Sequence, residues 1–445
     1  MATARNNTSA SHAPSACNSP MNSAGNLTVA DLAAAALRCS RQQDYQQAAA
    51  LYQQALQLAP SDPTLLFNYG AMLRIVGELG LAEEMLDRAI ALRPDDFEAL
   101  QLRSGLRRWS AEDNHVAALQ KQLAQLEALD KPSPKAVVHL CYALAKELED
   151  LGRYDESFAA LKRGASLRRQ HLNYKIDDDL ATFEALLKVQ KPSKPATAEQ
   201  GLTERSPTPV FVVSLPRAGS TLLERMLGCA PGVHLAGELN QFPQAIGRSL
   251  KAKLNTPPAS RAEMVEATSM LDMAEVGHHY LGQLPALPAG TTHVVDKLPL
   301  NLLNVGFIAA ALPRARIIYV RRNKLDHGYA MYKHLFAQAY PWSYDLAEIS
   351  QYYDASARLM DHWSEQWPER ICTIDYEELV ANPEQESRRA FAHCGLNWSP
   401  EVLDFHKANK AASTTGSASQ IRQPLHSRSV GLAEHYLEHL KELTY

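Results

Sequence analysis

The sequence predicts an all-α solenoid followed by an α/β domain with a parallel sheet. The first part of the chain repeats its own pattern of small and apolar residues after 34 positions, as a stack of helical hairpins does. The later part contains four short β-branched runs separated by helical stretches, which is typical of a parallel sheet covered by helices. With 445 residues, the chain is long enough for both parts.

The composition argues against several functional classes. Lys and Arg total 45 and Asp and Glu total 49, so the net charge of -4 lacks the basic excess of nucleic-acid-binding proteins. The six cysteines form no Cys-x-x-Cys pair, which argues against a disulfide framework or zinc ribbon and fits a reducing compartment. Because the sequence has no long apolar run and no signal-peptide pattern, we expect no membrane span and a cytoplasmic location.

The pattern along the chain predicts four segments. Residues 1–27 are rich in Ser, Asn and Ala, and we expect a disordered tail there. Residues 28–189 form the predicted helical-repeat domain. Residues 190–208 are rich in Pro, Ser and Thr and form the predicted linker. Residues 209–445 form the predicted α/β domain.

The repeat is visible when the chain is shifted by 34 residues, which superposes Ala48 on Ala82, Ala55 on Ala89, Leu58 on Leu92 and Pro60 on Pro94. Small residues suit close helix crossings, and proline suits a helix end. We expect further copies at about 96–130 and 135–170, the last with a turn at Gly152. The region resembles tetratricopeptide repeats, which implies a groove for a peptide or a dimer contact. A plain scaffold is the alternative.

Buried strands are predicted at four places: 209–215, 293–298, 315–321 and 370–376. Predicted helices separate them at about 221–228, 262–282, 300–311, 325–338, 346–367 and 384–393. In this architecture a ligand binds at the carboxyl ends of the strands.

The first predicted strand runs into the loop PRAGST, residues 216–221, and then into an amphipathic helix. Gly219 lets the backbone approach a ligand, the helix start offers unpaired amides, and Arg217 adds a guanidinium, so an anion site is expected. No lysine precedes Ser220, so the GxxxxGK[ST] pattern of nucleotide kinases is absent. A strand–turn–helix with an incidental arginine is the alternative.

The segment PRAGSTLLERML resembles the 5′-phosphosulfate-binding loop of sulfotransferases that use 3′-phosphoadenosine-5′-phosphosulfate (PAPS). The chain is most similar to bacterial sulfotransferases with tetratricopeptide repeats and to tyrosylprotein sulfotransferases, over about residues 209–436. The resemblance implies a P-loop-like fold, PAPS as donor, PAP as product and no metal. It also implies donor contacts from Arg217, Ala218, Gly219, Ser220 and Thr221, with Ala218 where the family usually has Ser.

By this resemblance three residues take catalytic roles. Glu238 matches the base, which the chemistry needs because a phenol with a pKa of about 10 is a poor nucleophile at neutral pH. Lys297 matches the lysine that neutralises charge on the leaving group. Ser417 matches the serine that steadies the sulfuryl oxygens. The alternatives are a surface or capping role for Glu238 and a structural ion pair between Lys297 and Asp296.

Two residues correspond to the family's nucleotide contacts. Arg322 matches the arginine that binds the 3′-phosphate. Tyr376 matches a tyrosine that contacts the nucleotide, and a core tyrosine is the alternative. Asp326 keeps a family position in which we expect a structural carboxylate at a helix start.

Besides Ala218, two further positions depart from the family pattern, and both predict weaker donor binding. A serine that binds the 3′-phosphate is replaced by Ala330, and a C-terminal cation is replaced by Leu432. Lys324 and Arg428 are the nearest cations that could compensate, while Arg422 keeps a basic position after Gln420.

The sequence therefore predicts in-line transfer of a sulfuryl group from PAPS to an acceptor hydroxyl, without a covalent enzyme intermediate. The acceptor is a protein tyrosine, another peptide or a small hydroxyl compound. The alternative is a catalytically weakened sulfotransferase-like protein that acts as a repeat-based interaction scaffold. A kinase-like transferase is disfavoured by the missing P-loop lysine. The partner of the repeats and a homodimer are left open.

Overall fold

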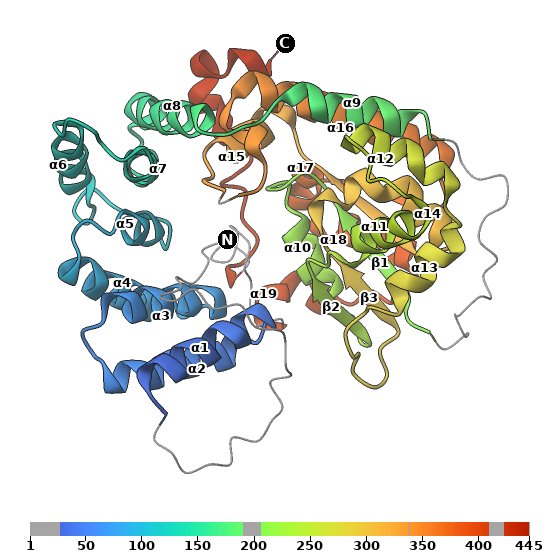
Figure 1. Ribbon diagram of the computed structural model, residues 1–445, viewed down its shortest axis with the longest axis horizontal. Coiled ribbons are helices and arrows are strands. Elements are labelled where there is room, and N and C mark those ends of the chain that lie inside the picture. The colour runs from blue at the N-terminus through green and yellow to red at the C-terminus, as the bar shows by residue number, and fades with distance from the viewer. Residues whose placement is uncertain (1–26, 190–205, 337, 409–421, 445) are drawn as a thin grey trace. The chain divides into compact units, whose positions relative to one another are not determined.

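The computed structural model describes residues 27–189, 206–336, 338–408 and 422–444 (Figure 1). The described chain forms two compact units. The helical unit contains residues 27–172, the segment 333–340 and Arg422, and the α/β unit contains the remaining described residues. Residues 333–340 therefore lie within the α/β part of the sequence but belong to the helical unit.

Most of the helical unit is built from consecutive helix pairs, as the repeat predicts. The predicted copy at 96–130 is the exception, because its two helices pack on the helix that follows them rather than on each other. Helices α1 and α2, α3 and α4, and α7 and α8 pack most extensively on one another. The helices are α1 (Val29–Arg41), α2 (Tyr45–Leu58), α3 (Pro63–Val76), α4 (Leu79–Leu92), α5 (Phe97–Ser104), α6 (Val116–Glu127), α7 (Pro134–Asp150) and α8 (Tyr154–Gln170).

The repeated small residues lie where helices of this unit cross. Ala48, Ala55, Ala82 and Ala89 are each fully buried, so a larger side chain at any of them would push neighbouring helices apart. Gly152 has a φ of 72° and forms the predicted turn between α7 and α8. The repeated leucines at 58 and 92 behave differently, because they are 59% and 50% exposed at the ends of their helices.

The α/β unit contains a five-stranded parallel sheet in the order β2-β3-β1-β4-β5. Its strands are β1 (Thr208–Val213), β2 (Val233–Gly237), β3 (His293–Asp296), β4 (Arg316–Arg321) and β5 (Ile371–Asp375). Four of them confirm the predicted strands. The edge strand β2 was not predicted, since its five residues are mostly half-buried and form no continuous apolar run.

Helices cover both faces of the sheet because alternate residues of each strand point to opposite sides. Val210 and Val212 of β1 belong to one core with the apolar residues of α10 (Ser220–Leu227) and α18 (Pro383–Cys394). Phe211, between them, contacts the rings of Phe242 and Tyr280 on the other face.

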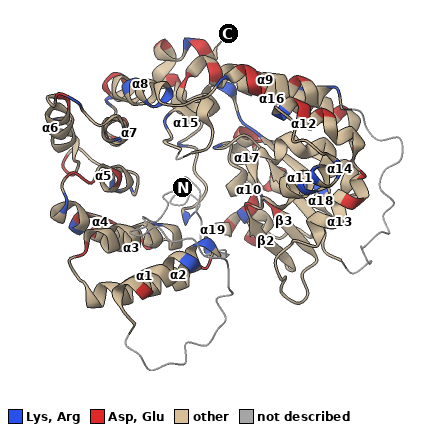
Figure 2. Ribbon diagram, viewed as in Figure 1, with Lys and Arg blue, Asp and Glu red and all other residues tan. Residues whose placement is uncertain are grey.

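The other helices of this unit are α9 (Ile176–Leu187), α11 (Gln241–Lys253), α12 (Arg261–Ala267), α13 (Met273–Leu281), α14 (Val305–Ala311), α15 (Lys324–Tyr332), α16 (Leu346–Gln366), α17 (Tyr376–Ala381) and α19 (Phe405–Ala408). Short 3-10 helices are η1 (Thr268–Met270), η2 (Pro299–Asn304), η3 (Pro341–Tyr344), η4 (Pro400–Asp404), η6 (Leu432–His439) and η7 (Lys441–Leu443). Acidic and basic residues occur together on the helices of each unit (Figure 2).

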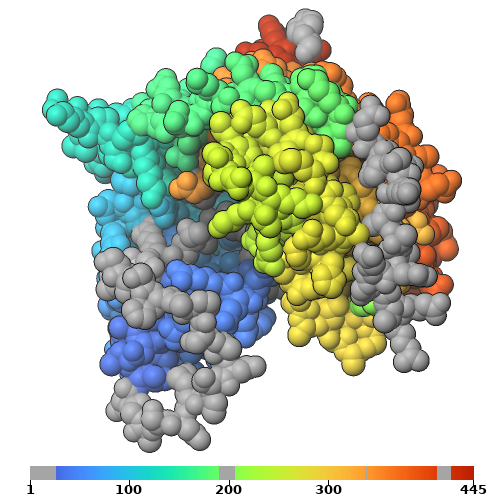
Figure 3. Space-filling view, turned by 45° about the vertical axis from the view of Figure 1, so that its right-hand side comes forward, coloured from blue at the N-terminus to red at the C-terminus, as the bar shows by residue number. Residues whose placement is uncertain are grey.

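Helix α9 belongs to the α/β unit although it precedes the predicted linker. It packs on α12 and α16, and Arg261 of α12 lies 2.6 Å from Asp179 of α9. Figure 3 shows the green residues of α9 lying over the yellow residues of α12. The division of the chain into domains at residues 189 and 208 stays a prediction.

Candidate functional site

The residues predicted to act on a ligand gather at one edge of the sheet. Glu238 directly follows β2, Lys297 follows β3, Arg322 follows β4 and Tyr376 follows β5. The loop that begins at Ser214 follows β1. Because all five strands are parallel, these residues lie at the carboxyl edge of the sheet, where α/β proteins bind their ligands.

The loop after β1 turns sharply into α10. Arg217 and Gly219 have φ values of 69° and 99°, so the chain enters the helix through two left-handed residues. A Cβ on Gly219 would lie 2.3 Å from Cδ2 of Tyr376, so this ring packs directly against the loop. Helix α10 begins without a side-chain cap, and the hydroxyl of Ser220, its first residue, accepts a hydrogen bond from Ser214 Oγ at 3.1 Å. An uncapped helix start of this kind attracts anions.

Two arginines meet at this loop. The Nη1 of Arg322 donates a hydrogen bond to the carbonyl of Arg217 at 3.1 Å. Burial, together with the positive charge of Arg322, lowers the pKa of the Arg217 guanidinium to about 10. Two like charges held together in a buried place favour an anion between them.

Arg322 is held on several sides. Its Nη2 donates to the carbonyl of Ser429 at 2.5 Å, and its Cζ lies 5.0 Å from the centre of the Tyr376 ring. The Tyr353 hydroxyl donates to the Arg322 carbonyl at 2.7 Å. Arg322 is 7% exposed, and its Nε is buried with no hydrogen-bond partner among the described residues. That N–H is an unused hydrogen-bond donor at the site.

Lys297 and Glu238 form the second feature of the site. The Lys297 ammonium donates to Glu238 Oε1 at 2.6 Å. The lysine side chain is only 2% exposed, whereas that of Glu238 is 25% exposed. Strand β3 pairs with β2, so the residues that follow the two strands are brought together. The pair therefore joins a buried cation to a carboxylate that reaches solvent.

Asp296 does not pair with Lys297. Its Oδ2 accepts a hydrogen bond from the Tyr280 hydroxyl at 3.2 Å in the core between the sheet and α13. Burial raises the pKa of Asp296 to about 8. The structural ion pair considered from the sequence is thus replaced by a contact between the two predicted catalytic residues, Lys297 and Glu238.

The structure shows the neighbours of the residues that depart from the family pattern and of the two cations considered as replacements. Ala330 is buried on α15, and Lys324 pairs with Asp354 at 2.9 Å. Arg428 donates to Gln423 Oε1 at 2.6 Å, and Leu432 begins the 3-10 helix η6. None of these contacts joins Lys324 or Arg428 to the loop after β1.

Asp326 has the structural role that was expected. Its two carboxylate oxygens accept hydrogen bonds from the backbone amides of Gly431 and Ala433 at 2.6 Å and 2.9 Å. The carboxylate thereby holds the start of η6 against α15.

Two other predicted residues are not part of the site as described. Ser417 is outside the described residues. Arg422 belongs to the helical unit, where its Nη2 donates to the carbonyl of Ile75 at 2.9 Å, near the end of α3.

The structure adds two residues that sequence reasoning did not select. His327 is 2% exposed, and its Nε2 lies 2.8 Å from the carbonyl of Pro216 in the loop. Burial, opposed only partly by this hydrogen bond, lowers the pKa of His327 to about 3, so the ring is neutral and Nε2 is the donor. Ser429 Oγ lies 2.7 Å from the Tyr376 hydroxyl. His327 could have been noticed as a histidine five residues after Arg322.

Models of two known families match parts of this chain. A sulfotransferase family model matches residues 209–400, and tetratricopeptide-repeat models match residues 41–106 and 138–171. The chain therefore carries a sulfotransferase-family domain behind tetratricopeptide repeats. The sulfotransferase match spans the five strands, except for the first residue of β1, and every predicted site residue except Ser417.

Two curated relatives are similar to this chain. An uncharacterized protein of Aquifex aeolicus is 28% identical over 400 residues, which are 88% of this chain and 51% of the relative. Protein-tyrosine sulfotransferase A of Caenorhabditis elegans is 20% identical over 237 residues, which are 51% of this chain and 61% of the relative. The chain thus spans between half and two thirds of the length of these relatives.

Solved structures that resemble this chain include two bacterial sulfotransferases. The sulfotransferase domain of the Synechococcus PCC 7002 olefin synthase is 20% identical, with a TM-score of 0.34 over 56% of this chain and 98% of that chain. A sulfotransferase from Alicyclobacillus acidocaldarius is 17% identical, with a TM-score of 0.30 over 54% of this chain and 100% of that chain.

Two kinds of feature are absent from the described residues. No described helix is long and apolar enough to cross a membrane. Within the same residues, no group of three or more His, Cys, Asp or Glu side chains is arranged to hold a metal ion.

Proposed function

We propose that this chain is a PAPS-dependent sulfotransferase that moves a sulfuryl group to an acceptor hydroxyl. The observation that carries the proposal is the 2.6 Å contact between Lys297 and Glu238 at the carboxyl edge of the sheet, beside the loop after β1. A reaction that takes a proton from one oxygen while another oxygen gains charge needs a base and a cation close together.

The residues fit the donor's two anionic ends. Arg217 and the uncapped start of α10 suit the 5′-phosphosulfate, and Ser220 and Thr221 add hydroxyls at the same place. Arg322, with its unsatisfied Nε, suits the 3′-phosphate, and the Tyr376 ring between Arg322 and Gly219 completes the nucleotide contacts. Bound PAPS supplies the sulfuryl group and leaves as PAP.

Glu238 is the base in this proposal. Its carboxylate is the more exposed member of the pair, so an acceptor hydroxyl reaches it from solvent. As the acceptor oxygen forms its bond to sulfur, Glu238 takes the hydroxyl proton. A tyrosine acceptor needs this help most because its hydroxyl is largely protonated at neutral pH.

Lys297 acts on the other side of the transfer. The bond between sulfur and the phosphate oxygen breaks, and its electron pair stays on that oxygen. The buried ammonium of Lys297 places a positive charge where this negative charge develops, and its low exposure of 2% strengthens the effect. Ser417 is proposed to steady the sulfuryl oxygens.

The acceptor proposed here is a protein tyrosine, in keeping with the match of Glu238 to the base of tyrosylprotein sulfotransferases. The tetratricopeptide repeats support a protein partner, because stacked repeats present extended binding surfaces.

A transfer assay tests the proposal. Full-length protein is incubated with PAPS and a tyrosine-containing peptide, and sulfated peptide and PAP are measured by mass spectrometry. We expect stoichiometric formation of both, and a rate at least about 100-fold lower in Glu238→Gln. Glu275→Gln, an exposed glutamate on α13, is the matched control and should retain the full rate. PAP release at an equal rate in wild type and Glu238→Gln would contradict the role of Glu238.

A further inference from the structure

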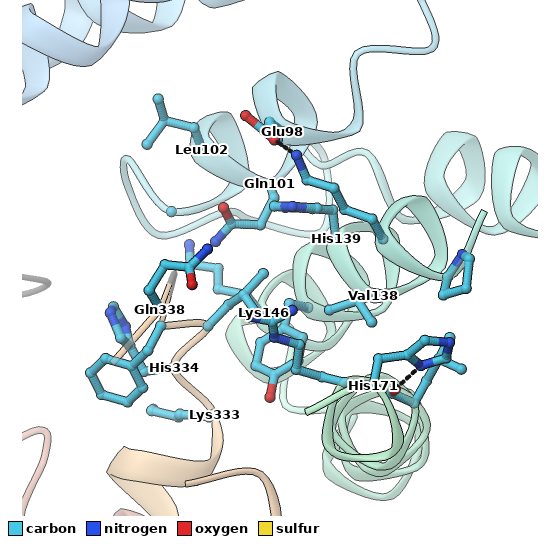
Figure 4. A pocket seen from close by; sticks show the side chains of 18 of the residues that line it. Glu98, Gln101, Leu102, Val138, His139, Lys146, His171, Lys333, His334 and Gln338 are labelled. Atoms are coloured by element: carbon cyan, nitrogen blue, oxygen red, sulfur yellow. Dashed lines mark hydrogen bonds and ion pairs between the residues drawn. The ribbon is translucent and has the colours of Figure 1, made fainter. Parts of the chain in front are cut away.

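The helical unit contains a cavity of about 780 Å³, which is within the range of about 300–1,000 Å³ usual for ligand sites. Helices α3, α5, α7 and α8 provide most of its wall, and the inserted segment 333–338 closes another side. In Figure 4 the side chains of Gln101 and His139 on the helices and of Gln338 on the inserted segment are directed into the same space.

The charges around this cavity are unbalanced. Its charged lining consists of one glutamate, Glu98, and five cations: Arg74, Lys135, Lys146, Arg168 and Lys333. Lys135 pairs with Glu98 at the rim, where the lysine side chain is 73% exposed. The carboxylates that pair with Lys146 and Lys333, Asp150 and Glu149, do not line the cavity. A ligand in the cavity therefore meets mainly positive charge.

Arg74 lines the cavity and has no carboxylate partner among the described residues. It lies in the last turn of α3, and no ion pair or hydrogen bond joins its guanidinium to another described residue. Burial lowers the pKa of Arg74. Arg74 is half-buried, and its buried Nε has no hydrogen-bond partner among the described residues, so an anionic ligand would satisfy a donor and a charge that are otherwise unpaired. Its planar fork of N–H donors matches a carboxylate.

The other walls suit a peptide rather than a small ion. Phe67, Leu102, Val138, Leu167 and Phe336 give the cavity an apolar surface for side chains. The side-chain amides of Gln101 and Gln338 can both donate and accept hydrogen bonds, as a peptide backbone requires. Free phosphate or sulfate would leave the apolar wall and these amides unused.

We propose that this cavity binds an acidic peptide segment of a partner protein, with a glutamate or aspartate side chain paired to Arg74. This deepens the protein partnership suggested above for the repeats, but it does not rest on sulfuryl transfer. The inserted segment supplies Gln338 and Lys333, so the cavity is formed by the repeats together with residues that follow α15 in the sequence.

Fluorescence polarisation on the full-length protein tests this proposal without any donor. The probe is a fluorescein-labelled octapeptide with four glutamates around a central phenylalanine, which cannot be sulfated. The matched peptide has glutamines in place of the glutamates. At low salt we expect the acidic peptide to bind at least about tenfold more tightly than the glutamine peptide.

Three variants assign the binding to the cavity. Arg74→Gln on α3 and Gln338→Glu on the inserted segment should each weaken binding of the acidic peptide about tenfold or more. Gln338 is exposed, so this second variant should keep the fold if Arg74→Gln alters it. Arg41→Gln, at the exposed end of α1, is the matched control and should bind like the wild type. Equal binding of the two peptides, or wild-type binding by both cavity variants, would overturn the proposal.

Discussion

The Lys297 ammonium lies 2.6 Å from the Glu238 carboxylate, although 59 residues separate the two along the chain. The pairing of β2 with β3 brings them together. In the proposed reaction Glu238 takes a proton and Lys297 stabilises the leaving oxygen. The reactants must therefore enter between two side chains that form an ion pair in the free protein. The same contact therefore contributes to stability and must open for activity.

Removing the carboxylate of this pair should destabilise the fold. Glu238→Gln leaves a lysine that is 2% exposed without its counterion. A fully buried pair broken in this way costs about 3–5 kcal/mol, and because Glu238 is 25% exposed we expect about 2 kcal/mol. Urea unfolding measures this loss. The double variant Glu238→Gln/Lys297→Met should recover part of it, since no unpaired charge remains.

An exposed pair in the same unit is the control for that measurement. Lys324 and Asp354 lie 2.9 Å apart, with side chains 24% and 55% exposed. Asp354→Asn should cost less than about 1 kcal/mol. Equal decreases in the free energy of unfolding for Asp354→Asn and Glu238→Gln would show that the Lys297–Glu238 pair contributes no more to stability than an exposed pair.

Gly219→Ala should damage both stability and donor binding. The new Cβ would meet Cδ2 of Tyr376 at 2.3 Å, and the φ of 99° is strained for any residue with a Cβ. The backbone strain alone costs about 1–3 kcal/mol. Thermal unfolding should show a lower midpoint, and Gly219→Ala/Tyr376→Ala should recover only the part due to the clash. A midpoint equal to the wild type would contradict this close packing.

Stability at acidic pH should depend on His327. Burial lowers the pKa of His327 to about 3, so the folded protein keeps the ring neutral while the unfolded chain binds a proton near its ordinary pKa of 6.5. The unfolding free energy should therefore fall as the pH drops below about 6.5, by about 2 kcal/mol at pH 5.

A variant without the ionisable ring isolates this effect. His327→Gln keeps an N–H group for the carbonyl of Pro216. Between pH 7 and pH 5, chemical unfolding should show the wild type losing about 2 kcal/mol relative to His327→Gln. Parallel pH profiles for the two proteins would mean that His327 is not held neutral.

Much of the fold could be predicted because its patterns are local. The small residues Ala48 and Ala82 indicated the repeat, and the apolar runs predicted four of the strands. The predicted helix at 262–282 was wrong as one element, because Asp272 accepts a hydrogen bond from the amide of Ala274 and starts a new helix, α13. The helix predicted at 325–338 ends at Tyr332, since the next residues join the helical unit.

The candidate site was predictable residue by residue but not as an arrangement. Glu238 and Lys297 could be selected from motifs, yet their contact depends on β2, a short, half-buried edge strand with little sequence signal. Tertiary packing also decides the neutral state of His327 and the contacts of Arg322 with Ser429. Residues about 100 positions apart meet in these contacts, beyond the reach of local patterns.

The most direct test of the account is a calorimetric titration of the full-length protein with PAP. We expect micromolar binding that is lost in Arg217→Ala and weakened at least about tenfold in Arg322→Gln. Arg321→Gln is the control, because the neighbouring Arg321 is already paired with Asp375 at 2.6 Å and 3.0 Å, and it should bind PAP like the wild type. No detectable binding at high micromolar PAP would contradict the PAPS-dependent function and leave the repeats as the functional part of the chain.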